Sequence, residues 1–148
     1  MKSVGKNILA VLAGIILGSI VNMAIVNAGP HVIPLPDGAD ISTMEGLRES
    51  MKLMTPANFI CPFLAHALGT FVGALVAAKL AASHHSKLAI GIGVYFLLGG
   101  MAMVVMLGGP LWFKAADLLL AYLPMALLGA ALAGRPNSEF EAEQSTST

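Results

Sequence analysis

Charged residues are scarce in this sequence, and their scarcity excludes an ordinary soluble domain. Only 11% of the 148 residues are charged, whereas a soluble domain carries about 25%. Eight basic residues balance eight acidic ones, so the chain has no basic excess with which to bind nucleic acid. The single cysteine, Cys61, excludes an internal disulfide. Hydrophobic residues instead make up 57% of the chain, and its mean hydropathy is +0.82, as expected for a membrane protein.

The sequence also lacks the motifs of common catalytic and cofactor sites. It contains no G-x-S-x-G, no H-E-x-x-H, no phosphate-binding loop and no paired catalytic cysteines. We therefore expect neither an enzyme nor a bound cofactor. Six methionines, with His31 and Cys61, are ligand types that suit Cu(I). No dense Met-x-x-Met or Cys/His cluster repeats, and methionine is also an ordinary apolar filler, so copper handling stays an alternative.

Four apolar runs are long enough to cross a bilayer core of roughly 30 Å. They lie at about residues 8–28, 59–82, 88–109 and 112–133. The fourth is the weakest because Lys114 and Asp117 interrupt its first turns, although Trp112 and Phe113 form an interfacial anchor. The sequence therefore predicts an all-α polytopic membrane four-helix bundle in residues 1–134. A disordered cytoplasmic tail is predicted for residues 135–148.

The basic residues near the ends of the runs predict an orientation. With the N-terminus inside, Lys2, Lys6, Lys79, Lys87 and Arg135 fall on the inner side, and Arg48, Lys52 and Lys114 fall on the outer side. This excess places both termini in the cytoplasm and the segment 30–58 outside. Alternatively, Val26-Asn27-Ala28 is a signal-peptide cleavage site, although the preceding apolar region exceeds the usual length of about 7–15 residues.

A short amphipathic helix is predicted in the first outer loop. Ser42 and Glu45 have the S-x-x-E spacing of a capping box. Apolar residues recur at spacings of three and four from Ile41 to Met54, and Pro56 ends the pattern. We expect the segment 42–54 to lie on the membrane surface or to cap the bundle. An ordered loop with accidental periodicity is the alternative.

Three of the predicted spans carry polar side chains at a similar depth below the outer surface. His66 lies about 10 Å inward from Phe59, Asn22 lies at a comparable depth, and Asp117 is slightly shallower. Thr70 follows His66 on the same helix row. Because ionisable groups inside a span mark functional sites, these four residues are the candidate ligand-binding site or proton pathway. Alternatively, they only form hydrogen bonds between helices, and Asp117 faces water at the helix entrance.

Small residues at intervals of four predict the faces through which the spans pack. Gly14 and Gly18 form such a row in the first span, Gly69 and Gly73 form one in the second, and Gly129 belongs to one in the fourth. Rows of this kind allow close approach of two helices. The partner helix can belong to the same chain, to a second copy or to another membrane protein.

A resemblance to known proteins covers most of the chain except the C-terminal tail. The run PFLAHALGTFVGALVAAKLAASHHSKLAIGIGVYFLLGG, followed by WFKAADLLLAYLPMALLGAALAG, resembles small four-span bacterial integral membrane proteins that have no assigned activity. The resemblance implies a multi-pass protein of the bacterial inner membrane. It transfers no functional residues.

Two classes of function fit these patterns. In the first, the protein is a small permease or ligand-binding membrane protein with a polar pocket in the outer leaflet. In the second, it is a non-catalytic accessory or scaffold subunit that assembles through its small-residue faces. Access of water to His66 distinguishes the two. In both cases the expected partners are the lipid bilayer and either a second copy or another membrane protein, and no nucleic acid is expected.

Overall fold

The computed structural model describes residues 2–134, which form helices and no strands. Within this range, four helical stretches are long and apolar enough to cross a membrane: Ser3–Val32, Pro56–Leu80, His85–Leu107 and Leu111–Leu132. The all-α prediction is confirmed, and the four apolar stretches indicate a multi-pass membrane protein. The predicted tail at 135–148 lies outside the described residues.

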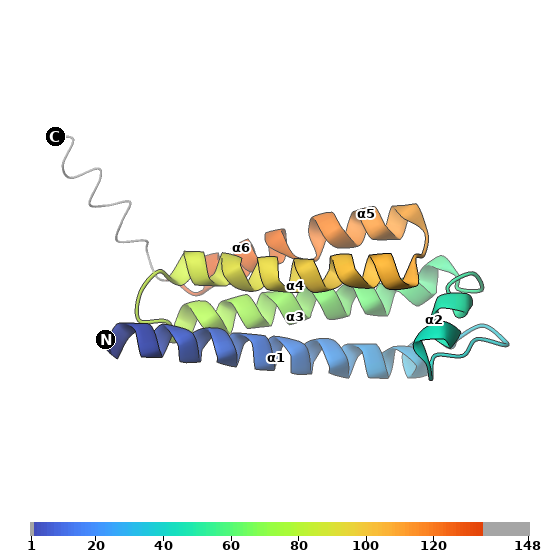
Figure 1. Ribbon diagram of the computed structural model, residues 1–148, viewed down its shortest axis with the longest axis horizontal. Coiled ribbons are helices and arrows are strands. Elements are labelled where there is room, and N and C mark those ends of the chain that lie inside the picture. Colours follow the sequence, from blue (N-terminus) through green and yellow to red (C-terminus); the bar gives the residue numbers. More distant parts are fainter. Residues whose placement is uncertain (1, 135–148) are drawn as a thin grey trace.

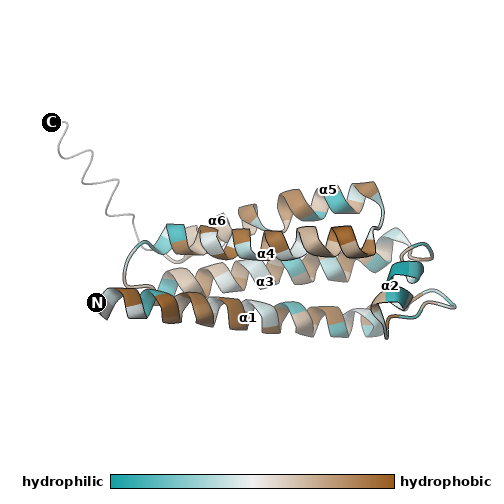
Figure 2. Cartoon of the chain, in the orientation of Figure 1, coloured by the Kyte–Doolittle hydropathy of each residue, from teal (hydrophilic) through white to brown (hydrophobic). Residues whose placement is uncertain are grey.

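Three long helices, α1 (Lys2–Val32), α3 (Ile60–Leu80) and α4 (His85–Leu107), run side by side (Figure 1). Two shorter helices, α5 (Leu111–Leu120) and α6 (Leu123–Leu132), follow one another along the same bundle. The loop between α1 and α3 contains α2 (Met44–Ser50) and a 3-10 turn, η1 (Pro56–Phe59). This loop lies at the end of the bundle opposite to the N-terminus, which we call the α2 end. Figure 2 shows apolar residues along the long helices and hydrophilic residues gathered at α2.

Glycine and proline determine where several of these helices end. Gly108 and Gly109 have φ values of 76° and 91°, and these two residues follow α4 directly. Only glycine adopts this left-handed region without strain, so α4 stops there. Pro110 then precedes α5. After α1, Pro34 and Pro36 favour the extended chain of the first loop.

The interface between α1 and α3 consists of backbone against backbone. A Cβ atom added to Gly14 would lie 2.6 Å from the carbonyl oxygen of Gly73, and one added to Gly18 would lie 2.6 Å from that of Gly69. These distances are shorter than any real Cβ contact, so only glycine permits the observed approach. The same condition holds for Gly129 of α6, where a Cβ would lie 2.8 Å from the carbonyl oxygen of Phe71.

The fourth span is not one continuous helix. The sequence pattern indicated a single run over 112–133, but α5 ends at Leu120 and α6 begins at Leu123. Pro124 lies at the start of α6. A proline has no N–H to donate and its ring clashes with the carbonyl group four residues earlier, so it disfavours a helix interior and is tolerated in a first turn, where Pro124 lies. The break places Tyr122 between the two helices.

The predicted capping box of the outer loop is wrong. Thr43 caps α2, and its hydroxyl oxygen accepts a hydrogen bond from the backbone N–H of Gly46 at 2.9 Å. Ser42 instead donates through both its N–H and its hydroxyl to Oδ1 of Asp40, at 2.8 and 2.6 Å. The carboxylate of Asp40 thus holds Ser42 outside the helix. The helix also ends at Ser50, so α2 is shorter than the predicted segment 42–54 at both ends.

Candidate functional site

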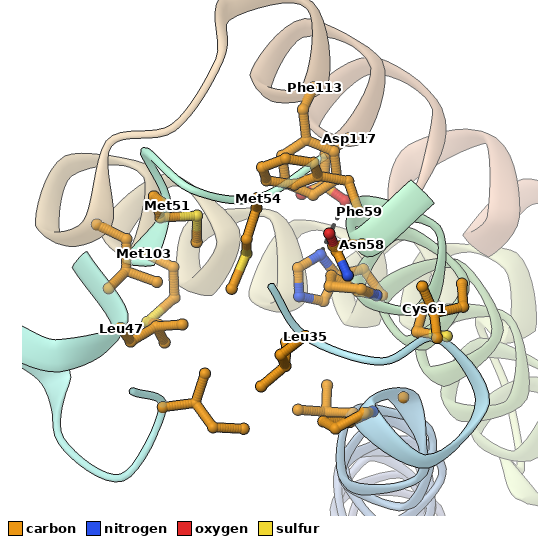
Figure 3. A pocket seen from close by; sticks show the side chains of 18 of the residues that line it. Leu35, Leu47, Met51, Met54, Asn58, Phe59, Cys61, Met103, Phe113 and Asp117 are labelled. Carbon is orange, nitrogen blue, oxygen red and sulfur yellow. Dashed lines mark hydrogen bonds and ion pairs between the residues drawn. The ribbon is translucent and has the colours of Figure 1, made fainter. Parts of the chain in front are cut away.

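A partly open cavity of about 340 Å³ lies at the α2 end of the bundle (Figure 3). Its walls come from α1, the first loop, α2, η1, α3, α4 and α5. Most of the lining is apolar. The periodic apolar positions of the predicted outer helix supply one wall, since Ile41, Leu47, Met51 and Met54 all line the cavity. Met44 does not follow them and is 46% exposed. The loop therefore covers this end of the bundle and turns Leu47, Met51 and Met54 toward the cavity.

His66 and Asp117 both line the cavity and contact each other. His66 Nδ1 lies 2.8 Å from Asp117 Oδ1. The side chain of Asp117 is only 2% exposed, whereas that of His66 is 23% exposed. The alternative in which Asp117 faces water at the helix entrance is therefore wrong. The carboxylate is buried behind the imidazole, which is the more accessible of the two groups.

The break in the fourth span adds a third group to this pair. The hydroxyl of Tyr122 donates to Asp117 Oδ2 at 3.0 Å. Its ring stacks on the imidazole of His66, with a centroid separation of 5.7 Å and an interplanar angle of 26°. Gly100 of α4 makes this position available, because a Cβ there would collide with the tyrosine hydroxyl. The side chain of Tyr122 thus contacts both members of the pair.

These contacts determine which ring nitrogen of His66 can form a hydrogen bond to another molecule. Tyr122 donates to one carboxylate oxygen of Asp117, and Nδ1 of His66 lies within hydrogen-bond distance of the other, an arrangement that suits the ionised form because it has only acceptors. With Asp117 ionised, Nδ1 of His66 carries the proton that is donated to Oδ1. In a neutral imidazole the other nitrogen, Nε2, is then an acceptor. Binding of Nδ1 to a carboxylate thereby fixes both the tautomer and the orientation of the ring.

The other two predicted site residues lie elsewhere. Thr70 is fully buried, and neither it nor Asn22 lines the cavity. Asn22 lies against α3, because a Cβ added to Gly69 would be 2.9 Å from the Cβ of Asn22. Thr70 Oγ1 and Asn22 Oδ1 are buried and have no hydrogen-bond partner among residues 2–134. The structure brings together His66 and Asp117, but it does not bring Asn22 and Thr70 into the same cavity.

Sequence reasoning missed Tyr122. Two signals could have indicated it. Pro124 marks a break in the fourth span, and a tyrosine inside an apolar run needs a partner for its hydroxyl. It also missed Phe59 and Phe113, whose ring centroids lie 4.7 Å apart beside Asp117 and which both line the cavity (Figure 3).

The sulfur-containing residues of the lining do not form a cluster with the histidine and acids. Met51, Met54 and Met103 lie on one side of the cavity, and Cys61 lies on the other in this view (Figure 3). Within the described part of the chain, no group of three or more His, Cys, Asp or Glu residues is placed to hold a metal ion. The arrangement instead suits a molecule held by apolar contacts and one directed polar group.

Comparisons with models of protein families, with curated proteins and with solved structures found no match to this chain. The cavity and its residues are therefore the features that indicate function. These offer an apolar wall, a buried carboxylate and a partly exposed imidazole.

Proposed function

We propose that this chain is a membrane protein that binds a small, largely apolar molecule in the cavity at the α2 end, with His66 as the group that forms a hydrogen bond to it. The observation that carries the proposal is the position of His66. Its ring lines the cavity while Nδ1 is held by a carboxylate that is 2% exposed. A histidine that serves only to join helices has no need of a cavity beside it.

The volume and lining of the cavity support this reading. Ligand sites are concave, mostly apolar and usually have volumes of roughly 300–1,000 Å³, with a few polar groups that orient the ligand. The cavity of about 340 Å³ falls at the small end of that range. An ionisable residue within a membrane span is by default a candidate functional site. Binding is the step these residues support, and a permease would in addition release the ligand on the opposite side.

The accessory-subunit alternative has less support. It requires the small-residue faces to be available to a second copy or another protein. Gly14 and Gly18 instead contact the backbone of α3, and Gly129 of α6 lies against α3 as well. Assembly through these faces would first require separation of helices that already pack within the chain.

We further propose that the α2 end faces the outside of a bacterial plasma membrane, with both termini in the cytoplasm. The excess of basic residues at the opposite end supports this orientation. Cysteine placed at the exposed position Glu45, in a Cys61→Ser background, should react with an impermeant maleimide in intact cells. Cysteine at the exposed position Ala82, near the other end, should not. Labelling of only the Ala82 variant would reverse the orientation.

The binding proposal can be tested with Cys61, the only cysteine of the chain, which lines the cavity. Three probes each carry a phenyl ring on a four-carbon chain and differ in the polar head, which in the third includes the last carbon: 4-phenylbutan-1-ol, 4-phenylbutylamine and 4-phenylbutyrate. In phosphatidylcholine nanodiscs, at least one of them should slow the modification of Cys61 by N-ethylmaleimide.

The matched variants change neighbouring residues of α4 in the same way. Val104 lines the cavity, whereas Val105 is 84% exposed. Val104→Phe should fill the cavity and abolish the protection, while Val105→Phe should preserve it. If none of the three probes protects Cys61 in the unmodified protein, or if the two variants behave alike, the cavity is not a binding site.

A further inference from the structure

The charges around the cavity restrict the kind of molecule that it can hold. Among the described residues that line it, only Cys61, His66 and Asp117 are titratable, and none is lysine or arginine. The parts of the wall that come from α1, the first loop, α2, η1 and α4 carry no charged side chain. Tyr122 faces the pair from the break between α5 and α6. The charge of the site is therefore the charge of His66 and Asp117.

The carboxylate of Asp117 needs a positive partner. Burying an ionised carboxylate in an apolar site is strongly unfavourable unless a charge or hydrogen bonds compensate it. Two donors reach Asp117, but the only ion pair that it forms within residues 2–134 is with His66. Lys114, one turn earlier on α5, does not line the cavity. When the imidazole is neutral, the pair carries one uncompensated negative charge.

Each class of polar head would meet this pair differently. With Asp117 ionised and His66 neutral, the pair has a net charge of −1 and an acceptor at Nε2, so in this state it repels an anion. A hydroxyl group can donate to Nε2 of neutral His66 but brings no charge. An ammonium group donates to the same nitrogen and also supplies the missing positive charge, in a surrounding where charge interactions are stronger than in water.

We infer that the ligand of this cavity is a small amphiphilic cation, in which one ammonium group binds Nε2 of His66 and an apolar body occupies the rest of the cavity. The inference rests on the proposed function, because it assumes that the cavity is a binding site. The body contacts Phe59, Phe113 and the methionines of the lining. Aromatic rings tolerate a nearby cation, and methionine side chains adapt to ligands of different shape.

The three probes test the inference directly because they carry similar apolar bodies and differ in the charge and hydrogen-bonding capacity of the head. Their dissociation constants are obtained from the concentration dependence of Cys61 protection, with phosphatidylcholine as the only lipid. The amine should bind at least about tenfold more tightly than the alcohol. The carboxylate should bind more weakly than both, because it brings a like charge and no donor.

The variant Asp117→Asn distinguishes the effect of the negative charge from the fit of the ligand's shape to the cavity. Asp117→Asn keeps the shape of the side chain and one acceptor oxygen but removes the negative charge. The affinity for the amine should fall to about that for the alcohol, and the affinity for the alcohol should change less than about threefold. The comparison among probes in the unmodified protein does not depend on the folding of this variant.

The outcomes distinguish this inference from the proposed function. If the alcohol or the carboxylate binds as tightly as the amine, and Val104→Phe abolishes that binding, the cavity is a binding site but its ligand is not selected by positive charge. If the amine is preferred and Asp117→Asn retains the preference, the charge assignment to Asp117 is wrong. If no probe protects Cys61, the proposed function itself fails.

Discussion

Helices α3 and α5 both contribute buried residues to the bundle, but the residues that they bury are opposite in kind. The buried residues of α3 are alanine, glycine and one threonine. The only buried residue of α5 is the carboxylate of Asp117. Figure 1 shows α1 following α3 along the bundle, whereas α5 rises away from α4 toward the α2 end. Close backbone packing holds one region together, and directed polar and aromatic contacts hold the other beside a cavity.

The two regions therefore have different roles: one holds helices together, and the other forms the polar site of the cavity. Glycine contacts between α1 and α3 leave no space for another molecule. On the other side, Asp117 and Tyr122 approach His66 through side chains. Substitutions on the two sides should therefore have different consequences, and the following predictions run from the largest expected effect to the smallest.

The largest effect should follow from a side chain placed between α1 and α3. Gly73→Leu should destabilise the protein by about 3 kcal/mol, at the upper part of the usual range for overpacking, because its Cβ alone would lie 2.8 Å from the carbonyl oxygen of Gly14. Gly99→Leu is the control, since a Cβ there meets nothing within 4 Å. Thermal unfolding in detergent measures both. Equal stability of the two variants would mean that α1 and α3 do not pack through this face.

A smaller loss should follow from removal of one hydroxyl at the site. Tyr122→Phe leaves Oδ2 of Asp117 without its donor, in a carboxylate that is 2% exposed. An unsatisfied buried acceptor costs about 1–3 kcal/mol. Tyr95→Phe makes the same chemical change at a residue that is 51% exposed and should have little effect. Unfolding by denaturant in micelles compares them, and similar losses in both variants would argue against a hydrogen bond between Tyr122 and Asp117.

The smallest effect on stability is expected at Asp40, whose carboxylate is exposed, in contrast to the buried carboxylate of Asp117. The hydroxyl and N–H of Ser42 lower the pKa of Asp40 by hydrogen bonding to it, the hydroxyl being the larger cause. Ser42→Ala should raise this pKa toward the ordinary value. A group with a lowered pKa stabilises the fold above its unfolded pKa and loses this effect as the pH falls through its folded pKa. The two proteins should thus converge in stability in acid. NMR titration of the Asp40 carboxyl carbon would contradict this account if Ser42→Ala left the pKa unchanged.

That His66 and Asp117 lie at the same level of the bundle could be predicted from the sequence, but which residues share the cavity could not. The constant rise of a helix placed His66 and Asp117 at similar levels, and the structure joins them. The same reasoning placed Asn22 at that level, yet Asn22 lies toward α3 and away from the cavity. Rotation about the helix axis depends on which small residues meet, and α1 contacts α3 through the row that Asn22 continues.

Local competition between neighbouring residues was equally hard to predict. Ser42 and Thr43 are both suitable N-caps, and the choice between them follows from Asp40, which binds Ser42. The position of Tyr122 follows from the break before Pro124 and from the space that Gly100 leaves. In both places a tertiary or short-range contact decides between local structures that the sequence pattern allows.

The most direct measurement of the central claim is the nitrogen NMR spectrum of the His66 ring, with histidine labelled by ¹⁵N and the protein in phosphatidylcholine nanodiscs. The chain has four histidines, so His66→Gln identifies the signals. At about pH 8, where an ordinary imidazole is neutral, we predict a protonated Nδ1, held by Asp117, and an unprotonated Nε2. Addition of 4-phenylbutylamine should shift the Nε2 signal in Val105→Phe but not in Val104→Phe. A ring protonated at Nε2 instead of Nδ1, or an Nε2 signal that none of the three phenylbutyl probes shifts, would contradict the account.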